Sequence, residues 1–449
     1  MRLSGVKHRP LNDFAGSRSM WNPVSQIAIL NHFSLALFFG EIMTTTDMIF
    51  NHQCWTAFLE HKISGGHLSP TEEERLRQFV DSREYLPLAK AFSEGTPFPL
   101  PELKTLNKRN SLKKRTVFMF PEKENIFLKF LTYTLLQYDS VFSDNLCSFR
   151  KNISVKTAMK KLAVQKDVPA KYSYRTDIHD YFASVDITLL LPKLKDLLKE
   201  DVPLYSFIVS LLTNPYAIQN GEKTVVKKGI MAGMPLSSFL ANLYLAEMDA
   251  YFSTQQLCYV RYSDDIILLT DTEKELHARK AEVLQWLQDY HLTVNTRKEQ
   301  ISFPGETWEF LGFSYCNKTI DISHVAMEKL MSKMKRKARA LLRWKEKNNT
   351  SDERAVRAFI RTFHRKLFDN PINSEITWAR WYFPIINTDR SLHRLDLYMQ
   401  DCIRYIASGN YSKSRYAFRY DDMKRLGYVS LVNQFYAFKQ KSNNKQVLI

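Results

Sequence analysis

The sequence predicts an α+β chain whose short strands carry acidic residues and whose C-terminal part is helical and basic. The run 172–176 is strand-like and leads directly into Asp177. The stretch VRYSDDIILLT, residues 260–270, sets Asp264 and Asp265 between two apolar, β-prone arms, as in a hairpin. A chain of 449 residues exceeds one ordinary core, so two to four domains or subdomains are expected.

The N-terminal part is expected to be a mainly helical extension over residues 1–95. Its most apolar run, residues 27–40, is short and contains polar residues, so it predicts a buried helix and no membrane span. Residues 71–92 predict one charged amphipathic helix. The apolar side of that helix is formed by Leu76, Phe79 and Val80. The prolines of PFPLPELK, residues 97–104, mark a boundary.

The central and C-terminal elements alternate between the two classes of secondary structure. Residues 116–120 predict a strand closed by Pro121, and a helix follows it. Helices are also expected over residues 187–200 and 202–213. Residues 327–347 predict a long helix with one apolar and one basic face, and the chain stays helical, basic and aromatic beyond it.

The composition indicates a globular protein with a polyanionic partner. Hydrophobic residues make up 45% and charged residues 25% of the chain, which is typical of a folded domain. The formal net charge is +17, and a surplus of this size favours nucleic acid, because each Lys or Arg that meets a phosphate releases counterions. The alternative is a basic protein without such a partner.

The cysteines point to a reducing compartment. There are five, they are far apart, and none forms a CxxC pair, which speaks against a disulfide framework and against a structural zinc site. The sequence shows no HExxH motif and no cleavable signal peptide. We therefore expect a cytoplasmic protein that does not contact a membrane.

The acidic pair at 264–265 has two interpretations. Adjacent carboxylates repel each other, and a solvated turn is the simpler explanation, since Asp and Ser are common in turns. The other is a metal site, in which Asp177 at the end of a strand faces Asp264 and Asp265 on the hairpin. Mg²⁺ prefers a few carboxylates together with substrate phosphates, and two such ions can clamp the attacking and leaving oxygens of phosphoryl transfer.

Two motifs make the second interpretation specific. TDIHDYFASVD (176–186) resembles motif A of reverse transcriptases, and YSDD (262–265) resembles their motif C. The resemblance implies two Mg²⁺ ions, replaceable by Mn²⁺, held by Asp177, Asp264, Asp265 and the backbone carbonyl of Ile178. It also implies an incoming dNTP beside Asp180, Tyr181 and Phe182. Phe182 matches the aromatic that excludes a ribose 2′-hydroxyl, and Tyr181 is the more plausible core ring.

Further motifs follow in the order of the same family. KKRTVFMFP (113–121) and LCSFRKNIS (146–154) resemble its fingers motifs, which implies nucleotide contacts from Arg115 and Arg150. GIMAGMPLSSFLANLYLAEMD (229–249) resembles motif B, with Gly233 beside the nucleotide. LTVNTRKEQISF (292–303) resembles motif D, with Lys298 as the acid near the leaving pyrophosphate. WEFLGFSY (308–315) resembles motif E, the primer grip, which is formed by Phe310, Leu311, Gly312 and Phe313.

The resemblance implies a right-hand polymerase fold. Its parts would be fingers over 96–170, a palm with an antiparallel sheet over 171–325, a fingers insertion at about 200–230, and a helical thumb over 326–449. The thumb would hold the RNA–DNA duplex through Lys333, Arg336, Lys337, Arg339 and Arg343. One departure concerns motif B, where Ala232 stands in place of the usual Gln, so nucleotide preference and fidelity are open.

The motif B segment, the short thumb and the N-terminal extension are most similar to the defence-associated ("unknown group") reverse transcriptases of bacteria, which are related to retron and group II intron enzymes. This implies an RNA-directed DNA polymerase that copies a cognate structured noncoding RNA in anti-phage defence. The alternatives are a retron- or intron-like element enzyme, protein-primed untemplated synthesis of the abortive-infection type, and a non-enzymatic RNA-binding protein. The template, primer, product, phage trigger and oligomeric state stay open.

Overall fold

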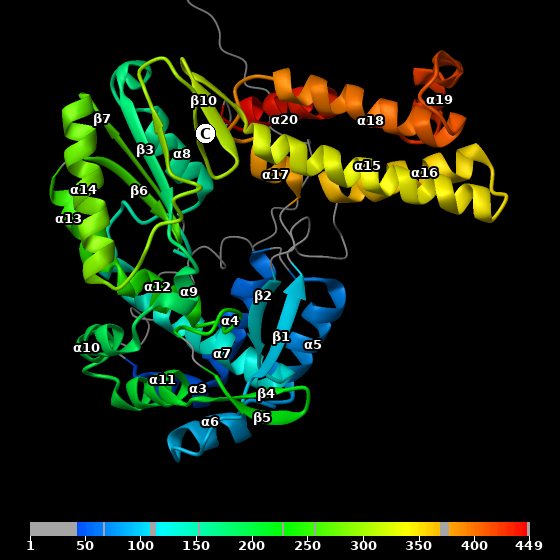
Figure 1. Cartoon of the computed structure of the whole chain (residues 1–449). Coiled ribbons are helices and arrows are strands. Elements are labelled where there is room, and N and C mark those ends of the chain that lie inside the picture. The colour runs from blue at the N-terminus through cyan, green and yellow to red at the C-terminus, as the bar shows by residue number, and fades with distance from the viewer. Residues whose placement is uncertain are drawn as a thin grey trace, which may run out of the picture. The chain divides into compact units, whose positions relative to one another are not determined.

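The computed structural model describes residues 43–65, 68–107, 114–150, 153–226, 229–255, 257–368 and 377–446. The apolar run 27–40 lies outside them. Helices and strands are mixed throughout, as Figure 1 shows. No helix in this described part is apolar over a length that would cross a bilayer.

Within the described residues, four helices precede β1, and their core contains one tryptophan. These are α3 (Thr45–Phe50), α4 (His52–Ser64), α5 (Pro70–Asp81) and α6 (Leu86–Ser93). The buried Trp55 of α4 stacks on Phe130 of α7 (Glu122–Thr134) with 3.9 Å between ring centroids, and on Tyr85 with 4.5 Å. The N-terminal helices therefore share a core with the segment that follows, because large aromatic rings bury much area at one contact.

The prediction of a single helix over 71–92 is wrong. The chain forms α5 and α6 with a break between them, where Arg83 adopts a left-handed φ of 52°. Pro87 explains the break, since a proline has no amide hydrogen and is accommodated in the first turn of a new helix. The start of α5 is fixed by a capping box between Ser69 and Glu72.

The first sheet brings together two distant segments. Its strand order is β2-β1-β4-β5, with bounds β1 (Glu102–Asn107), β2 (Lys114–Met119), β4 (Tyr216–Gln219) and β5 (Glu222–Val225). β1 pairs with β2 in antiparallel and meets β4 in parallel through Glu102 and Ile218. The β4–β5 turn is Asn220-Gly221, both with positive φ, which is the favoured two-residue hairpin turn. β4 and β5 lie within residues 200–230, and the assignment of this range to a fingers insertion stays a prediction.

The second sheet carries the acids. Its order is β6-β7-β3-β8, and all three pairings are antiparallel. The strands are β3 (Tyr172–Asp177), β6 (Cys258–Tyr262), β7 (Asp265–Thr270) and β8 (Gln300–Ser302). Helix α14 (Glu273–Asp289) packs on β3 and β7, while α8 (Val155–Ala163) and α13 (Ala246–Thr254) pack on β6. Because helices cover it, β6 and β7 are almost continuously buried and apolar instead of alternating.

Shorter helices connect these elements. They are the 3-10 helices Leu135–Val141 and Val168–Ala170, and the α-helices α9 (Tyr181–Ser184), α10 (Ile187–Leu197), α11 (Val202–Thr213) and α12 (Ser237–Tyr244). The helices predicted at 187–200 and 202–213 are thus confirmed as α10 and α11, each with an Asp side chain capping its N-terminus.

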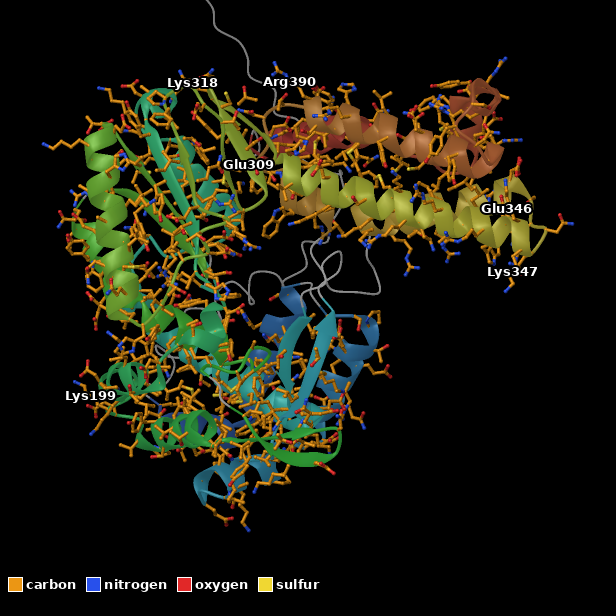
Figure 2. All side chains as sticks on the ribbon, in the orientation of Figure 1. Lys199, Glu309, Lys318, Glu346, Lys347 and Arg390 are labelled. Atoms are coloured by element: carbon orange, nitrogen blue, oxygen red, sulfur yellow. The ribbon has the colours of Figure 1, made fainter. Side chains whose placement is uncertain are left out.

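A three-stranded meander leads into the C-terminal helices. β9 (Trp308–Phe310), β10 (Phe313–Cys316) and β11 (Thr319–Ile322) are followed at once by α15 (His324–Lys347). Ser323 caps this helix, and Glu309 accepts a hydrogen bond of 3.0 Å from the His324 amide at its start (Figure 2). The first turn of the long helix is therefore fixed to the sheet.

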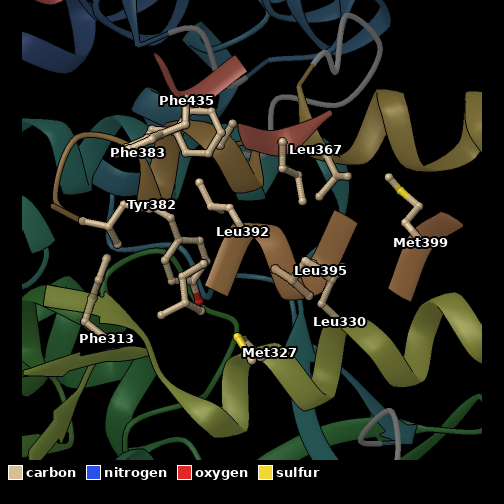
Figure 3. Close-up of a cluster of buried hydrophobic side chains, with 14 of the residues drawn as sticks. Phe313, Met327, Leu330, Leu367, Tyr382, Phe383, Leu392, Leu395, Met399 and Phe435 are labelled. Atoms are coloured by element: carbon tan, nitrogen blue, oxygen red, sulfur yellow. The ribbon is translucent and has the colours of Figure 1, made fainter. Parts of the chain in front are cut away.

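The C-terminal helices form a bundle around a shared apolar core. Beyond α15 they are α16 (Asp352–Leu367), α17 (Trp378–Tyr382), α18 (Arg390–Ser408), α19 (Tyr420–Arg425) and α20 (Leu431–Gln446), with a 3-10 helix at Lys413–Ala417. α15 and α16 both pack on α18. Figure 3 shows Met327 and Leu330 of α15 near Leu392 and Leu395 of α18, with Phe313 of the meander at the edge of the cluster. This core continues beneath the meander. The start of α15 therefore packs against the meander through buried apolar side chains.

The α+β class, the antiparallel sheet with the acids and the helical C-terminal region are confirmed, and the arrangement is consistent with a right-hand polymerase fold.

Candidate active site

The acids meet at one end of the second sheet. Asp177, the last residue of β3, pairs directly with Asp265, the first residue of β7. Asp264 lies in the two-residue turn before Asp265, and its carbonyl accepts a hydrogen bond of 2.9 Å from the Ile178 amide. Opposite residues in an antiparallel pair have their Cβ atoms about 5 Å apart. The register therefore brings together three carboxylates from two segments of the chain.

The turn itself depends on an unusual backbone conformation. Ser263 has a φ of 59°, in the left-handed region that residues other than Gly, Asn and Asp seldom occupy. This conformation lets β6 reverse into β7 within two residues, as in the tight turns of β-hairpins. The interpretation of residues 264–265 as a solvated turn is wrong, because Ser263 is buried and Asp264 and Asp265 are half-buried.

Burial and mutual repulsion disfavour the charged acids. Burial, followed by the charge of Asp264, raises the pKa of Asp265 to about 6. Burial also raises the pKa of Asp264, and the nearby Asp177 adds to the effect. A cation placed among these carboxylates would relieve both the repulsion and the lost hydration.

Two basic side chains already neutralise part of this charge. Lys298 Nζ lies 2.6 Å from Asp177 Oδ1, and Arg175 Nη2 lies 3.4 Å from Asp265 Oδ1. The sequence motifs predicted a role for Lys298 in the site but did not predict one for Arg175. The signal was available, since Arg175 and Asp177 are two apart on β3 and therefore share one face.

The donor set fits a hard divalent cation, although the side chains are not arranged around one. No three His, Cys, Asp or Glu side chains of the described residues converge closely enough to hold an ion. Asp177 is turned to Lys298 and Asp265 to Arg175, so ammonium and guanidinium groups occupy the carboxylates that an ion would use. Carboxylate oxygens are the ligands that Mg²⁺ prefers. Ile178 is buried beside the turn, where its predicted carbonyl contact stays a prediction.

A buried polar network holds the acidic turn, and sequence reasoning missed it. Arg261 of β6 and Asp249 of α13 are fully buried and form a bidentate ion pair, with Nε–Oδ1 at 2.9 Å and Nη2–Oδ2 at 2.6 Å. Arg261 Nη1 also donates to the carbonyl of Ser263 at 3.1 Å. The guanidinium thus fixes the residue directly before Asp264.

The other side of the turn is held by the segment that precedes α8. Ser148 Oγ accepts a hydrogen bond of 2.8 Å from the Ser263 amide, and the Ser148 carbonyl accepts one of 2.9 Å from the Asn242 side chain. The backbone of Arg261 exchanges hydrogen bonds with Asn145 and Cys147. Both polar groups of the left-handed Ser263 backbone are therefore satisfied inside the protein. The available signal was a pair of opposite charges in apolar surroundings at 249 and 261.

The residues predicted beside the nucleotide fall into different environments. Phe182 is half-buried on α9, and Asp180 is exposed with a φ of 42°. Tyr181 is buried and donates its hydroxyl to the Ala241 carbonyl, so its ring supports the core, as its alternative interpretation held. Gly233 has a φ of 104°, and a Cβ there would lie 2.7 Å from the Phe118 carbonyl, so only glycine fits.

Three predicted contacts disagree with the environment of the side chain. Arg150 is almost buried and pairs with Asp139 through two hydrogen bonds of 3.1 and 3.0 Å, so it stabilises its own loop instead of facing the acids. Phe310 and Phe313 are fully buried in the core beneath the meander, which excludes direct contact with a primer. The side chain of Arg115 lies outside the described residues, although its backbone is part of β2.

A cavity of about 870 Å³ opens in front of the acids and reaches the C-terminal helices. The turn residues Leu311 and Gly312 line it, so this part of the predicted primer grip does face the open space. Its basic lining comes from Arg175, Arg297, Lys298, Lys329, Lys333 and Lys366, and its aromatic lining from Trp378, Trp381 and Tyr382. The other predicted duplex contacts lie on the outer face of α15, where Arg336, Arg339 and Arg343 are exposed and Lys337 is half-buried.

The comparisons with known proteins agree with this geometry over the central segment. Residues 107–315 match the family model described as reverse transcriptase (RNA-dependent DNA polymerase). The group II intron-encoded protein LtrA of Lactococcus lactis subsp. cremoris is 25% identical over 207 residues, which are 46% of this chain. The match covers 32% of LtrA, so the chain corresponds to about a third of that relative.

Solved structures with a similar arrangement include two telomerases. Telomerase from Candida albicans, in complex with a fragment of telomeric RNA, has a TM-score of 0.40 at 12% identity over 79% of this chain and 71% of that one. The apo telomerase from Candida tropicalis has a TM-score of 0.42 at 13% identity over 74% and 68%. Within this chain, the segment similar to reverse transcriptases is thus 107–315, which contains all three acids.

Proposed function

We propose that this protein is an RNA-directed DNA polymerase. The observation that carries the proposal is the register of the second sheet, which sets Asp177 opposite Asp265 and beside Asp264 within a segment that matches the reverse transcriptase family. Phosphoryl transfer needs positioned cations and neutralisation of charge more than covalent chemistry from the protein. The three carboxylates can position the cations. The basic side chains that line the adjacent cavity can neutralise phosphate charge.

The proposal assigns a different role to each group of residues in the site. Asp177, Asp264 and Asp265 would hold two Mg²⁺ ions, or Mn²⁺ in their place, which activate the attacking oxygen and stabilise the leaving one. Lys298 loses its partner when Asp177 turns to a cation, and its ammonium can then donate a proton to the departing pyrophosphate. Arg175 is placed to neutralise a phosphate at the same end of the sheet. The half-buried ring of Phe182 would select dNTPs.

The test is primer extension by the full chain with Mg²⁺ and dNTPs on a primed RNA template. Replacement of both turn acids, Asp264→Ala with Asp265→Ala, should abolish synthesis while RNA binding persists. A matched control is Asp271→Ala, which removes an exposed carboxylate just after the same strand. Synthesis that survives the double replacement would refute the proposal, and RNA binding without synthesis by the natural protein would favour the non-enzymatic alternative.

For the biological role, we propose cDNA synthesis in the cytoplasm on a structured noncoding RNA in defence against phage. The support is the resemblance of residues 229–249 to defence-associated enzymes. Cells that carry the natural protein should resist phage, and cells with the double Ala variant should not. Sequencing of RNA and DNA bound to the protein, with and without phage, would identify the template and separate copied from untemplated, protein-primed products.

A role in an intron-like element is the second candidate, because the curated relative is an intron-encoded protein. In that case the bound RNA should be an intron that contains or adjoins the coding region, and the acids should be needed for mobility and not for resistance to phage. A retron-like role would instead yield a branched RNA–DNA product.

A further inference from the structure

One face of helix α16 is made of arginines that the candidate active site does not use. Arg354, Arg357 and Arg361 are exposed, Arg365 is half-buried, and the four recur every three to four residues. They line a shallow hollow of about 300 Å³ together with the small residues Ala358 and Thr362. Residues at this spacing share one face of a helix, and eleven steps of 1.5 Å give a row about 16 Å long.

This face is opposite to the core. The buried residues of α16 alternate with the arginines along the helix, so they define the other side of it. They are Ala355, Val356, Phe359, Ile360, Phe363 and Leu367. The core thus holds the helix in place, and the guanidinium groups are presented on a rigid support. The hollow shares no lining residue with the cavity in front of the acids, although Lys366 and Leu367 at the end of the same helix reach that cavity.

The row is not neutralised by the protein. Among the described residues, none of the four guanidinium groups has a carboxylate partner, and Arg354 instead lies over the Trp344 ring at 5.8 Å. The two acids of α16 are taken by other cations: Asp352 pairs with Lys345 at 2.9 Å and Glu353 with Arg425 at 2.8 Å. Four like charges at neighbouring positions repel one another, and a polyanion would remove that repulsion.

We propose that this arginine face, residues 354, 357, 361 and 365, binds the phosphate backbone of a double-helical RNA segment other than the duplex at the acids. The inference rests on the proposed function, which supplies a structured RNA. Arginine forks suit phosphate oxygens because they donate two parallel hydrogen bonds, and Ala358 and Thr362 leave room for close approach. Single strands are held mainly by stacked rings, whereas among the described residues only the Trp344 ring makes a cation–π contact with these arginines, and Arg354 covers it. A membrane surface is disfavoured because the exposed face carries no large apolar side chain between the arginines.

The experiment compares two double variants of the full chain. Arg357→Gln with Arg361→Gln removes two charges from the arginine face. Arg390→Gln with Arg394→Gln removes two exposed charges at the same spacing from α18, where Arg390 is at the start of the helix (Figure 2). Thermal unfolding should be the same for both, because all four side chains are exposed.

The probes are a 20-base-pair RNA hairpin, a DNA hairpin of the same length, poly-glutamate, and a short primed template with or without the RNA hairpin at its 5′ end. We expect the α16 variant to bind the RNA hairpin about 10-fold more weakly, with the slope of log affinity against log salt smaller by about 2. Extension of the short template should stay within about 2-fold of the natural protein, while the advantage given by the added hairpin should be lost. The α18 variant should keep that advantage.

Equal losses in both variants, or unchanged affinity and slope in the α16 variant, would overturn the proposal. Loss of DNA-hairpin binding with intact RNA-hairpin binding would assign the face to DNA. Loss of poly-glutamate binding alone would assign it to an acidic protein. Binding of the RNA hairpin is measured without dNTPs, so it tests the arginine face even if the protein synthesises no DNA. Failure of this proposal can therefore be distinguished from failure of the proposed polymerase function.

Discussion

The acidic turn and helix α16 place charge in opposite ways. Around Asp264, three cations have carboxylate partners: the fully buried Arg261 with Asp249, the exposed Lys298 with the buried Asp177, and the half-buried Arg175 with Asp265. On α16 three of the four arginines are exposed, the fourth is half-buried, and none is paired with an acid in the described part of the chain. Buried charges fix a geometry, because any displacement leaves them unpaired in a poor solvent. Exposed charges attract a partner over a distance but hold no geometry. The first arrangement suits chemistry and the second suits binding.

The largest effect is expected in the buried network. Arg261→Met alone leaves Asp249 buried without a partner, which should cost about 3–5 kcal/mol of stability. The double variant Arg261→Met with Asp249→Leu should recover most of that stability, because apolar groups can replace a buried ion pair. Synthesis should nevertheless fall, since the carbonyl of Ser263 has lost its donor.

Thermal unfolding and steady-state kinetics separate the two roles. For the double variant we expect kcat to fall by about 10-fold or more, with KM for dNTP changed by less than about 2-fold and a higher Mg²⁺ requirement. A double variant with natural stability and natural kcat would show that the network only supports the fold and does not position the acidic turn.

The next effect concerns the nucleotide pocket. Phe182→Ala should admit ribonucleotides more readily, because it opens space where a 2′-hydroxyl would lie. A loss of about 10-fold in the dNTP/NTP ratio of kcat/KM is expected, which is about 1.4 kcal/mol. Tyr181→Phe is the control, because it removes only a buried hydroxyl. Unchanged discrimination in Phe182→Ala would place the gate at another residue.

A pH-dependent effect on stability is expected from the burial of Asp265 and its repulsion by Asp264. The pKa of Asp265 is raised to about 6 in the fold from an ordinary value near 4, so the folded protein binds a proton between these values that the unfolded chain does not. This group therefore destabilises the metal-free fold above pH 6, and the penalty disappears as the pH falls toward 4.

Asp265→Asn should thus stabilise the protein in EDTA at pH 7.5 and have little effect at pH 4.5, while it abolishes synthesis. Denaturant unfolding at the two pH values measures this. Equal stability of variant and natural protein at pH 7.5 would mean that burial and the charge of Asp264 do not penalise the Asp265 carboxylate.

The smallest effect is expected on the exposed face of α15. Arg339→Gln with Arg343→Gln should leave the thermal stability unchanged, since surface charges contribute little to it. Affinity for a primed template should fall by only a few-fold, with a salt slope smaller by about 2. A filter-binding series in salt measures both. A loss of stability in this variant would contradict the division between buried and exposed charge.

Local pattern was sufficient for several elements. The hairpin at 260–270, the strand before Asp177 and the helix at 327–347 were all predicted, because runs of apolar residues and an amphipathic period can be recognised without knowledge of the neighbouring segments. The helix predicted over 71–92 failed at Pro87, where charged amphipathic periodicity continued across a real break. The prediction gave more weight to the apolar period on both sides of Pro87 than to the rule that a proline marks a helix boundary.

The sequence by itself determined which residues are available for the proposed chemistry: the acids 177, 264 and 265, Lys298 and the basic surplus, because residue type and order are covalent properties. Only the tertiary structure decided how they are used. It turned Arg150 to Asp139, buried Phe310 and Phe313, and set Arg261 and Asp249 beneath the turn. These outcomes depend on which segments share a core. A charged arginine is stable in water without a partner, whereas a buried arginine lowers the stability of the protein unless it is paired and hydrogen-bonded.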